Sequence, residues 1–252
     1  MKTLSTEERT VQTDCGEIVF TFERKDIKNI NLRIHHTGNI YVSAPISVSQ
    51  NVVDTFVVSK CNYIRKAIKS FEHNNVSYSE MQYISGENVT FLGKNMRIKI
   101  IKDSAEFVTC DGIYVYIHVK RPDYYNRKKN LYNQWLNEQC DTVFNEIMQT
   151  VHKKFIPYEV DYPRLKIRNM TSRWGSCLPS KGIITLNKRL IEAPKNCIEY
   201  VVYHEFCHFI HPNHSKQFYG LLQIMLPEWK VSKTQLEKTL CIVTIPNKPL
   251  CK

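Results

Sequence analysis

The sequence predicts an α+β protein in which a β-rich part precedes a mainly helical part. Apolar residues alternate with period two over much of the first half, and from Asp123 they recur with the helical period of about 3.6 residues. We therefore expect a β-rich N-terminal part over residues 1–122, a second part over residues 123–240 and an extended tail over residues 241–252. With 252 residues, 42% of them hydrophobic, the chain can bury one or two cores.

The N-terminal part is predicted to be a small antiparallel meander, a helix and then further strands. Period-two alternation predicts strands at residues 18–22, 30–34, 40–42, 89–91, 96–100 and 113–119. Helical spacing of apolar residues predicts a helix over residues 49–72. The histidines of this part lack carboxylate or cysteine partners in sequence, so we expect them at the surface or in packing: His35, His36, His73 and His118.

The second part is predicted to begin with a long helix. A stripe of apolar residues over 131–151 follows the helical period and ends before Pro157. A strand at residues 165–167, a turn at residues 174–176 and a returning strand at residues 183–186 then predict a hairpin. This hairpin is expected immediately in front of a further helix.

That further helix carries the motif His204-Glu205-Phe206-Cys207-His208. Two histidines four residues apart on a helix differ by about 40° in projection and about 6 Å in rise, so both imidazoles can reach one metal ion. Glu205 lies beside the histidine stripe, where its carboxylate can act as a general base toward a metal-bound water. The alternative is a chance pairing on a partly buried helix, with Glu205 as an ordinary charged residue.

Two further histidines are candidates for a third ligand. His211 would continue the helical stripe, but it lies about 10 Å from His204 in rise, which is too far for both to bind one tetrahedral ion. Pro212 disfavours helical geometry in the residue before it and Asn213 tolerates a left-handed turn, so the helix is expected to break here. The turn can bring His214 to the metal, and we favour His214 over His211 as the third ligand.

Several segments follow one another in a recognisable order and spacing: Ala44-Pro45, Gly86-Glu87, Phe91-Leu92-Gly93, Arg173 to Cys177, Ile183 to Asn187 and His204 to Phe218. Through them the chain resembles the YgjP-like metallopeptidases, relatives of the SprT-like zincins, over most of residues 16–235. Phe206 departs from the family pattern, which usually has a leucine there. This departure changes packing behind the site and affects no ligand.

The resemblance implies a zincin-like helical catalytic core with an edge hairpin and one bound Zn²⁺. In that family the expected zinc ligands fall on His204, His208 and His214, and the expected catalytic acid and base falls on Glu205. The resemblance also implies peptide or protein substrates. Finally, it implies that residues 183–187 can form an edge strand on which an extended peptide pairs across the zinc.

Arg173 and Trp174 have two interpretations. A tryptophan beside a glycine often fills the core while the glycine permits a tight turn. Alternatively, Arg173 lies at the cleft, where a fixed cation can bind a carboxylate or phosphate of the substrate or stabilise developing negative charge. Both residues are therefore candidate substrate-binding residues.

The composition predicts a cytoplasmic enzyme. No segment approaches the run of about 18 apolar residues that a membrane span requires, and the first residues lack the apolar region of a signal peptide. The nine cysteines include no CxxC pair, which indicates reduced thiols rather than a disulfide framework or a second zinc site.

The formal charge of +11 is compatible with contact to nucleic acid, and equally with a compositional bias of the host proteome. The densest basic cluster, residues 121–129, also contains Tyr124 and Tyr125, which could stack on bases. A solvated helix face is the simpler interpretation of this cluster. The sequence does not predict the oligomeric state.

Three functions remain open at this point. The leading one is a zinc metallopeptidase. The second is a metal-dependent nucleoside triphosphate pyrophosphatase, an activity with which YgjP-like proteins have been associated, although no glycine-rich phosphate loop is visible. The third is a non-enzymatic binding module that a structural zinc ion stabilises.

Overall fold

The computed structural model describes residues 3–14, 16–34, 38–65, 68, 81–170 and 173–240. His35, His36, His73 and the tail 241–252 lie outside the described residues. The chain divides into two compact units, one within residues 1–78 and the other within residues 79–242. The division thus falls near residue 78, whereas the change of apolar period had suggested residue 122. The reason is packing, because the strands after residue 87 share one core with the helices that follow them.

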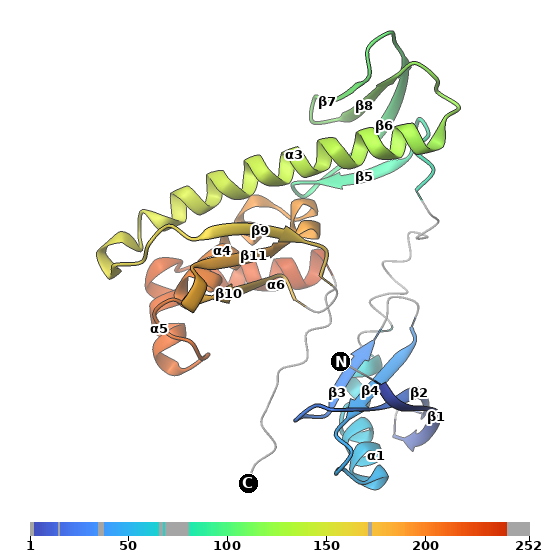
Figure 1. Ribbon diagram of the computed structural model, residues 1–252, viewed down its shortest axis with the longest axis vertical. Coiled ribbons are helices and arrows are strands. Elements are labelled where there is room, and N and C mark those ends of the chain that lie inside the picture. The colour runs from blue at the N-terminus through green and yellow to red at the C-terminus, as the bar shows by residue number, and fades with distance from the viewer. Residues whose placement is uncertain are drawn as a thin grey trace. The chain divides into compact units, whose positions relative to one another are not determined.

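The first unit contains a four-stranded sheet and a helix (Figure 1). Its elements are β1 (Thr3–Thr13), β2 (Gly16–Lys25), β3 (Asn31–Ile34), β4 (Ile40–Ala44) and α1 (Gln50–Ser59). The strand order is β1-β2-β4-β3, with β2 and β4 parallel, so the predicted antiparallel meander is wrong at that pairing. The sequence also did not predict β1, because residues 4–8 are exposed on both faces of the strand and show no alternation. The helix residues Val53 and Val57 belong to the same core as Phe20 and Phe22 of β2.

A second four-stranded sheet opens the second unit. Its strands are β5 (Asn88–Phe91), β6 (Lys94–Lys102), β7 (Phe107–Cys110) and β8 (Tyr114–Val119). Their order, β5-β6-β8-β7, repeats the pattern of the first sheet, with a parallel central pair between two antiparallel pairs. The long helix α3 (Tyr125–His152) packs against this sheet and confirms the predicted helical stripe.

The third sheet has the order β10-β11-β9 and lies next to the motif helix (Figure 1). Its strands are β9 (Arg164–Arg168), β10 (Gly175–Leu178) and β11 (Ile183–Asn187). β11 pairs with β9 in parallel and with β10 antiparallel, so both of its edges are occupied. The expectation that residues 183–187 form an edge strand is therefore wrong. The predicted hairpin of residues 165–167 with residues 183–186 is also wrong, because these strands run parallel; the hairpin is formed by β10 and β11 instead. Gly175, which the sequence assigned to a turn, begins the strand β10 instead. This additional strand, and not β11, is the edge strand beside α4.

The second unit also contains short helices: η1 (Ile156–Tyr158), η2 (Pro179–Lys181), η3 (Lys188–Glu192), α4 (Lys195–Cys207), α5 (Lys216–Met225) and α6 (Trp229–Thr239). The motif helix α4 packs against α3, α5, α6 and β10. The combination of helices and mixed sheets is the predicted α+β class. Among the described residues, no helix is both long and apolar enough to cross a membrane.

Candidate active site

Three histidine side chains converge at the end of α4. His204 lies in the last turn of this helix, His208 is its C-terminal cap, and His214 comes from the loop before α5. One ring nitrogen from each lies within 4.8 Å of the other two. The Nε2 atoms of His204 and His214 are 2.9 Å apart. The predicted pair and the favoured third histidine are thus brought together.

The helix α4 ends at Cys207, earlier than the break expected at Pro212, and the chain then returns His214 to His204, as the sequence predicted. The Nδ1 atom of His208 lies 3.2 Å from the carbonyl oxygen of His211. Because a carbonyl oxygen only accepts, Nδ1 of His208 donates this bond and its Nε2 keeps a free lone pair. Ser215 then caps α5 by accepting a hydrogen bond from the backbone N–H of Phe218, at 3.3 Å. His211 therefore orients a candidate ligand through its backbone and is not part of the cluster of imidazoles.

Phe218 forms the floor of the histidine cluster. Its side chain is fully buried, and its ring centroid lies 4.9 Å, 4.7 Å and 4.8 Å from the rings of His204, His208 and His214, respectively. From the sequence, Phe218 was only one apolar position of a helical stripe. Nothing in that pattern distinguishes it from its core neighbours, because the contact depends on the turn before α5.

The environment keeps the three imidazoles neutral. Burial lowers the pKa of His204 to about 3, with a further decrease from the neighbouring His208 and His214. Burial likewise lowers the pKa of His208 and of His214. Neutral imidazoles offer lone pairs to a metal ion, so this donor set fits zinc. The Nδ1 atom of His204 is buried and has no hydrogen-bond partner within the described part of the chain.

Glu205 is buried against the edge strand β10. A Cβ atom added to Gly175 would lie only 2.5 Å from Oε1 of Glu205, so the absence of a side chain at Gly175 makes room for the carboxylate. The backbone N–H of Cys177, two residues further along β10, donates a hydrogen bond to this carboxylate. Burial raises the pKa of Glu205 to about 8, although the Arg173 cation and the bond from Cys177 act in the opposite direction.

Arg173 and Trp174 directly precede β10, and their side chains lie in different environments. Arg173 is exposed, and its charge acts on Glu205. Trp174 is partly buried and packs against the core of the second unit, as expected for a tryptophan that fills the core. The carbonyl oxygens of both residues accept hydrogen bonds from Asn187, at 3.0 Å and 2.8 Å. Asn187 and Gly175 were not predicted from the sequence to be parts of the site.

Two of the four basic residues in the cluster at residues 121–129 form ion pairs with carboxylates of the protein. Arg127 donates to Glu106 at 2.8 Å, and Arg121 lies 3.6 Å from Asp123. Lys128 is buried. These pairings reduce the charge that the cluster can offer to phosphate groups, and nucleic-acid binding stays a prediction.

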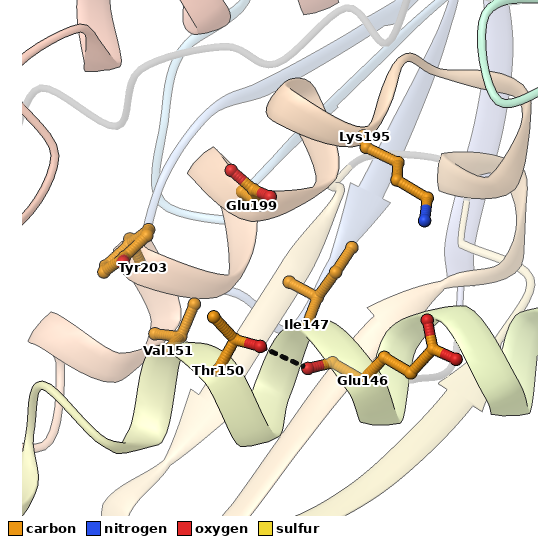
Figure 2. Close-up of a pocket in the computed structure, with 7 residues that line it drawn as sticks. All are labelled: Glu146, Ile147, Thr150, Val151, Lys195, Glu199 and Tyr203. Carbon is orange, nitrogen blue, oxygen red and sulfur yellow. Dashed lines mark hydrogen bonds between the residues drawn. The ribbon is translucent and has the colours of Figure 1, made fainter.

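A separate pocket of about 210 Å³ lies between α3 and α4 (Figure 2). Its lining residues are Glu146, Ile147, Thr150, Val151, Lys195, Glu199 and Tyr203. α4 contributes Lys195, Glu199 and Tyr203, which are four residues apart and therefore share one face of the helix. This face is not the one that carries His204 and His208. The pocket therefore lies apart from the histidine cluster.

Comparisons with known proteins find a matching family model and several similar solved structures. The family model described as YgjP-like, metallopeptidase domain, matches residues 28–239. The metallopeptidase zymogen abylysin of Pyrococcus abyssi is 18% identical, with a TM-score of 0.37, over 40% of this chain and 99% of that chain. The zymogen jannalysin of Methanocaldococcus jannaschii is 20% identical, with a TM-score of 0.29, over 38% of this chain and 93% of that chain. A search among curated proteins finds no match.

Proposed function

The chain belongs to the YgjP-like metallopeptidase family, and from this premise we propose that it is a zinc-dependent peptidase whose active site consists of His204, Glu205, His208 and His214. The observation that carries the proposal is the convergence of three neutral imidazoles at the end of the helix that also contains Glu205.

His204, His208 and His214 would hold the metal ion through one ring nitrogen each. In the described part of the chain, the group of potential ligands around this point comprises these three side chains and no fourth. Catalytic zinc sites typically have three protein ligands and an open fourth position, whereas structural sites are closed by four. The donor set therefore supports a catalytic site more than a structural one. A bound zinc ion supplies a Lewis acid and lowers the pKa of a coordinated water.

Glu205 would act as the general base and then as the general acid. Its carboxylate would accept a proton from the attacking water and deliver that proton to the amine of the leaving peptide. The carboxylate packs directly against Gly175 and accepts a hydrogen bond from the N–H of Cys177, and these two contacts restrict its position. The exposed Arg173 would provide a fixed positive charge beside the reaction, where negative charge develops on the substrate.

The substrate would bind along β10 rather than along β11. Among the described strands, β10 pairs with β11 alone, and it borders Glu205. An extended peptide could add to the other side of β10 through main-chain hydrogen bonds. Such binding would place a peptide bond close to the base.

The proposal is tested by metal analysis and hydrolysis assays on the full chain. We expect about one zinc ion per chain, consistent with one three-histidine site. We also expect cleavage of an unfolded protein, loss of cleavage after chelation and recovery on adding zinc. Hydrolysis of nucleoside triphosphates without peptide cleavage would contradict the proposed peptidase function and support a pyrophosphatase. Zinc binding without hydrolysis of either substrate would indicate a structural zinc site.

A further inference from the structure

Asn187, the last residue of β11, is a fully buried polar residue outside the histidine cluster. Its Nδ2 donates hydrogen bonds to the carbonyl oxygens of Met170, at 2.7 Å, and Arg173, at 3.0 Å. Its Oδ1 accepts from the backbone N–H of Met170, at 3.4 Å, and of Arg189, at 3.2 Å. A side-chain amide has two donors and two acceptor lone pairs, so these four bonds use its whole capacity.

The backbone of Asn187 makes a further bond to the residues that lead into β10. Its N–H donates to the carbonyl oxygen of Trp174, at 2.8 Å. The carbonyl groups of two consecutive residues, Arg173 and Trp174, are thus both held by Asn187. Gly175, the first residue of β10, follows directly. One buried residue therefore fixes the place where β10 begins.

The start of β10 determines where the carboxylate of Glu205 can lie. Gly175 approaches so closely that a Cβ atom there would come within 2.5 Å of Oε1 and 2.8 Å of Cγ of Glu205. Two residues later, the N–H of Cys177 donates to the same carboxylate. A shift at the start of β10 would change both constraints together.

We propose that Asn187 is a positioning residue for the hydrolytic reaction: by holding the carbonyl groups of Met170 and Arg173 with its side chain, it fixes the start of β10 against the carboxylate of Glu205. This inference rests on the proposed function, since it assigns a kinetic consequence to Asn187. A purely structural role, in which Asn187 only caps η3 through Arg189, predicts a loss of stability without a specific loss of turnover.

The test compares Asn187→Ser with two control variants. Serine retains one hydroxyl donor, so its side chain cannot hold the carbonyl groups of both Met170 and Arg173, whereas the backbone bond to Trp174 is unaffected. Asn145→Ser is the matched control, because Nδ2 of Asn145 also donates to a backbone carbonyl, that of Asp141 at 2.7 Å, but within α3. Met148→Ala, which opens a cavity in the core around α3, is the control for loss of stability.

For Asn187→Ser we expect kcat on an unstructured peptide to fall about tenfold or more, as a misplaced catalytic group predicts, with the zinc content unchanged. Asn145→Ser and Met148→Ala should keep kcat close to the wild type at temperatures well below their melting points. If kcat of Asn187→Ser is no lower than that of the controls, the inference is wrong. If Asn187→Ser does not fold, Asn187→Gln is used instead. Glutamine retains both amide donors, but its side chain is longer by one methylene, so the carbonyl groups of Met170 and Arg173 would have to shift to meet it.

A second readout does not depend on activity. Hydrogen exchange at the amide of Cys177 should be faster in Asn187→Ser than in the wild type, and unchanged in Asn145→Ser. If the wild type cleaves no peptide, the proposed function fails, yet this exchange experiment still tests whether Asn187 fixes β10. Equal protection of the Cys177 amide in all three proteins would overturn the inference.

Discussion

Replacing Gly175 by alanine should displace the carboxylate of Glu205, the proposed general base, without removing any functional group. The added Cβ would lie 2.5 Å from Oε1, 2.8 Å from Cγ and 2.9 Å from Cδ of Glu205. An ordinary contact begins at about 3.4 Å, so Glu205 or β10 must move by about 0.9 Å. A displacement of about 1 Å can reduce turnover by about 10²-fold, and we therefore expect kcat to fall by about 10 to 100-fold.

Gly220→Ala is the matched control for this change. Gly220 lies within α5, and an added Cβ there would meet no atom within 4 Å. Alanine is favoured over glycine inside a helix by about 1 kcal/mol, so this variant should be at least as stable as the wild type and fully active. The assay is cleavage of a fluorogenic peptide by both variants, together with their zinc content and melting temperature. Unchanged turnover in a folded, zinc-loaded Gly175→Ala protein would refute the contact between β10 and Glu205 as a determinant of catalysis.

Other predictions concern the ligands, the floor of the site and the surface charge. His214→Ala should lower the zinc content to a small fraction of the wild type, whereas His211→Ala should lower zinc affinity only modestly; the reverse order would show that the ligand is misassigned. Phe218→Leu should keep the fold but weaken zinc binding about tenfold, because the floor that aligns the imidazoles is lost; zinc affinity equal to that of the wild type would contradict this. If the basic surface binds DNA, the logarithm of affinity should fall with the logarithm of salt concentration by about 0.7 to 0.9 per phosphate contact, and salt-independent binding would exclude that mode.

The local features of the site could be predicted from the sequence. The histidine spacing on α4 follows from the helical period, and the restriction that Pro212 places on its neighbour predicts that the helix ends before His214, although α4 already ends at Cys207. Both depend on residues close together in the chain. For the same reason α3 was predicted, since its apolar stripe is continuous over residues 131–151.

Features that depend on distant partners were missed or wrongly predicted. Residues 183–187 have the alternation of a strand, but alternation does not reveal that β9 and β10 flank that strand on both sides. The four residues of β10 include a glycine and a serine, so they resembled a turn. The contact between Gly175 and Glu205, and the bonds of Asn187 to Arg173, join positions that only tertiary packing brings together.

The most direct test of the account is the zinc content and peptidase activity of Glu205→Gln beside those of the wild type. The amide preserves the size of the carboxylate but cannot accept the proton, and it leaves the three imidazoles in place. We predict about one zinc ion per chain in both proteins, and activity lower by about 10²-fold or more in the variant, as expected for the loss of a general base. Full activity in a rigorously purified, zinc-loaded Glu205→Gln protein would contradict the central claim that Glu205 is the base of a zinc peptidase.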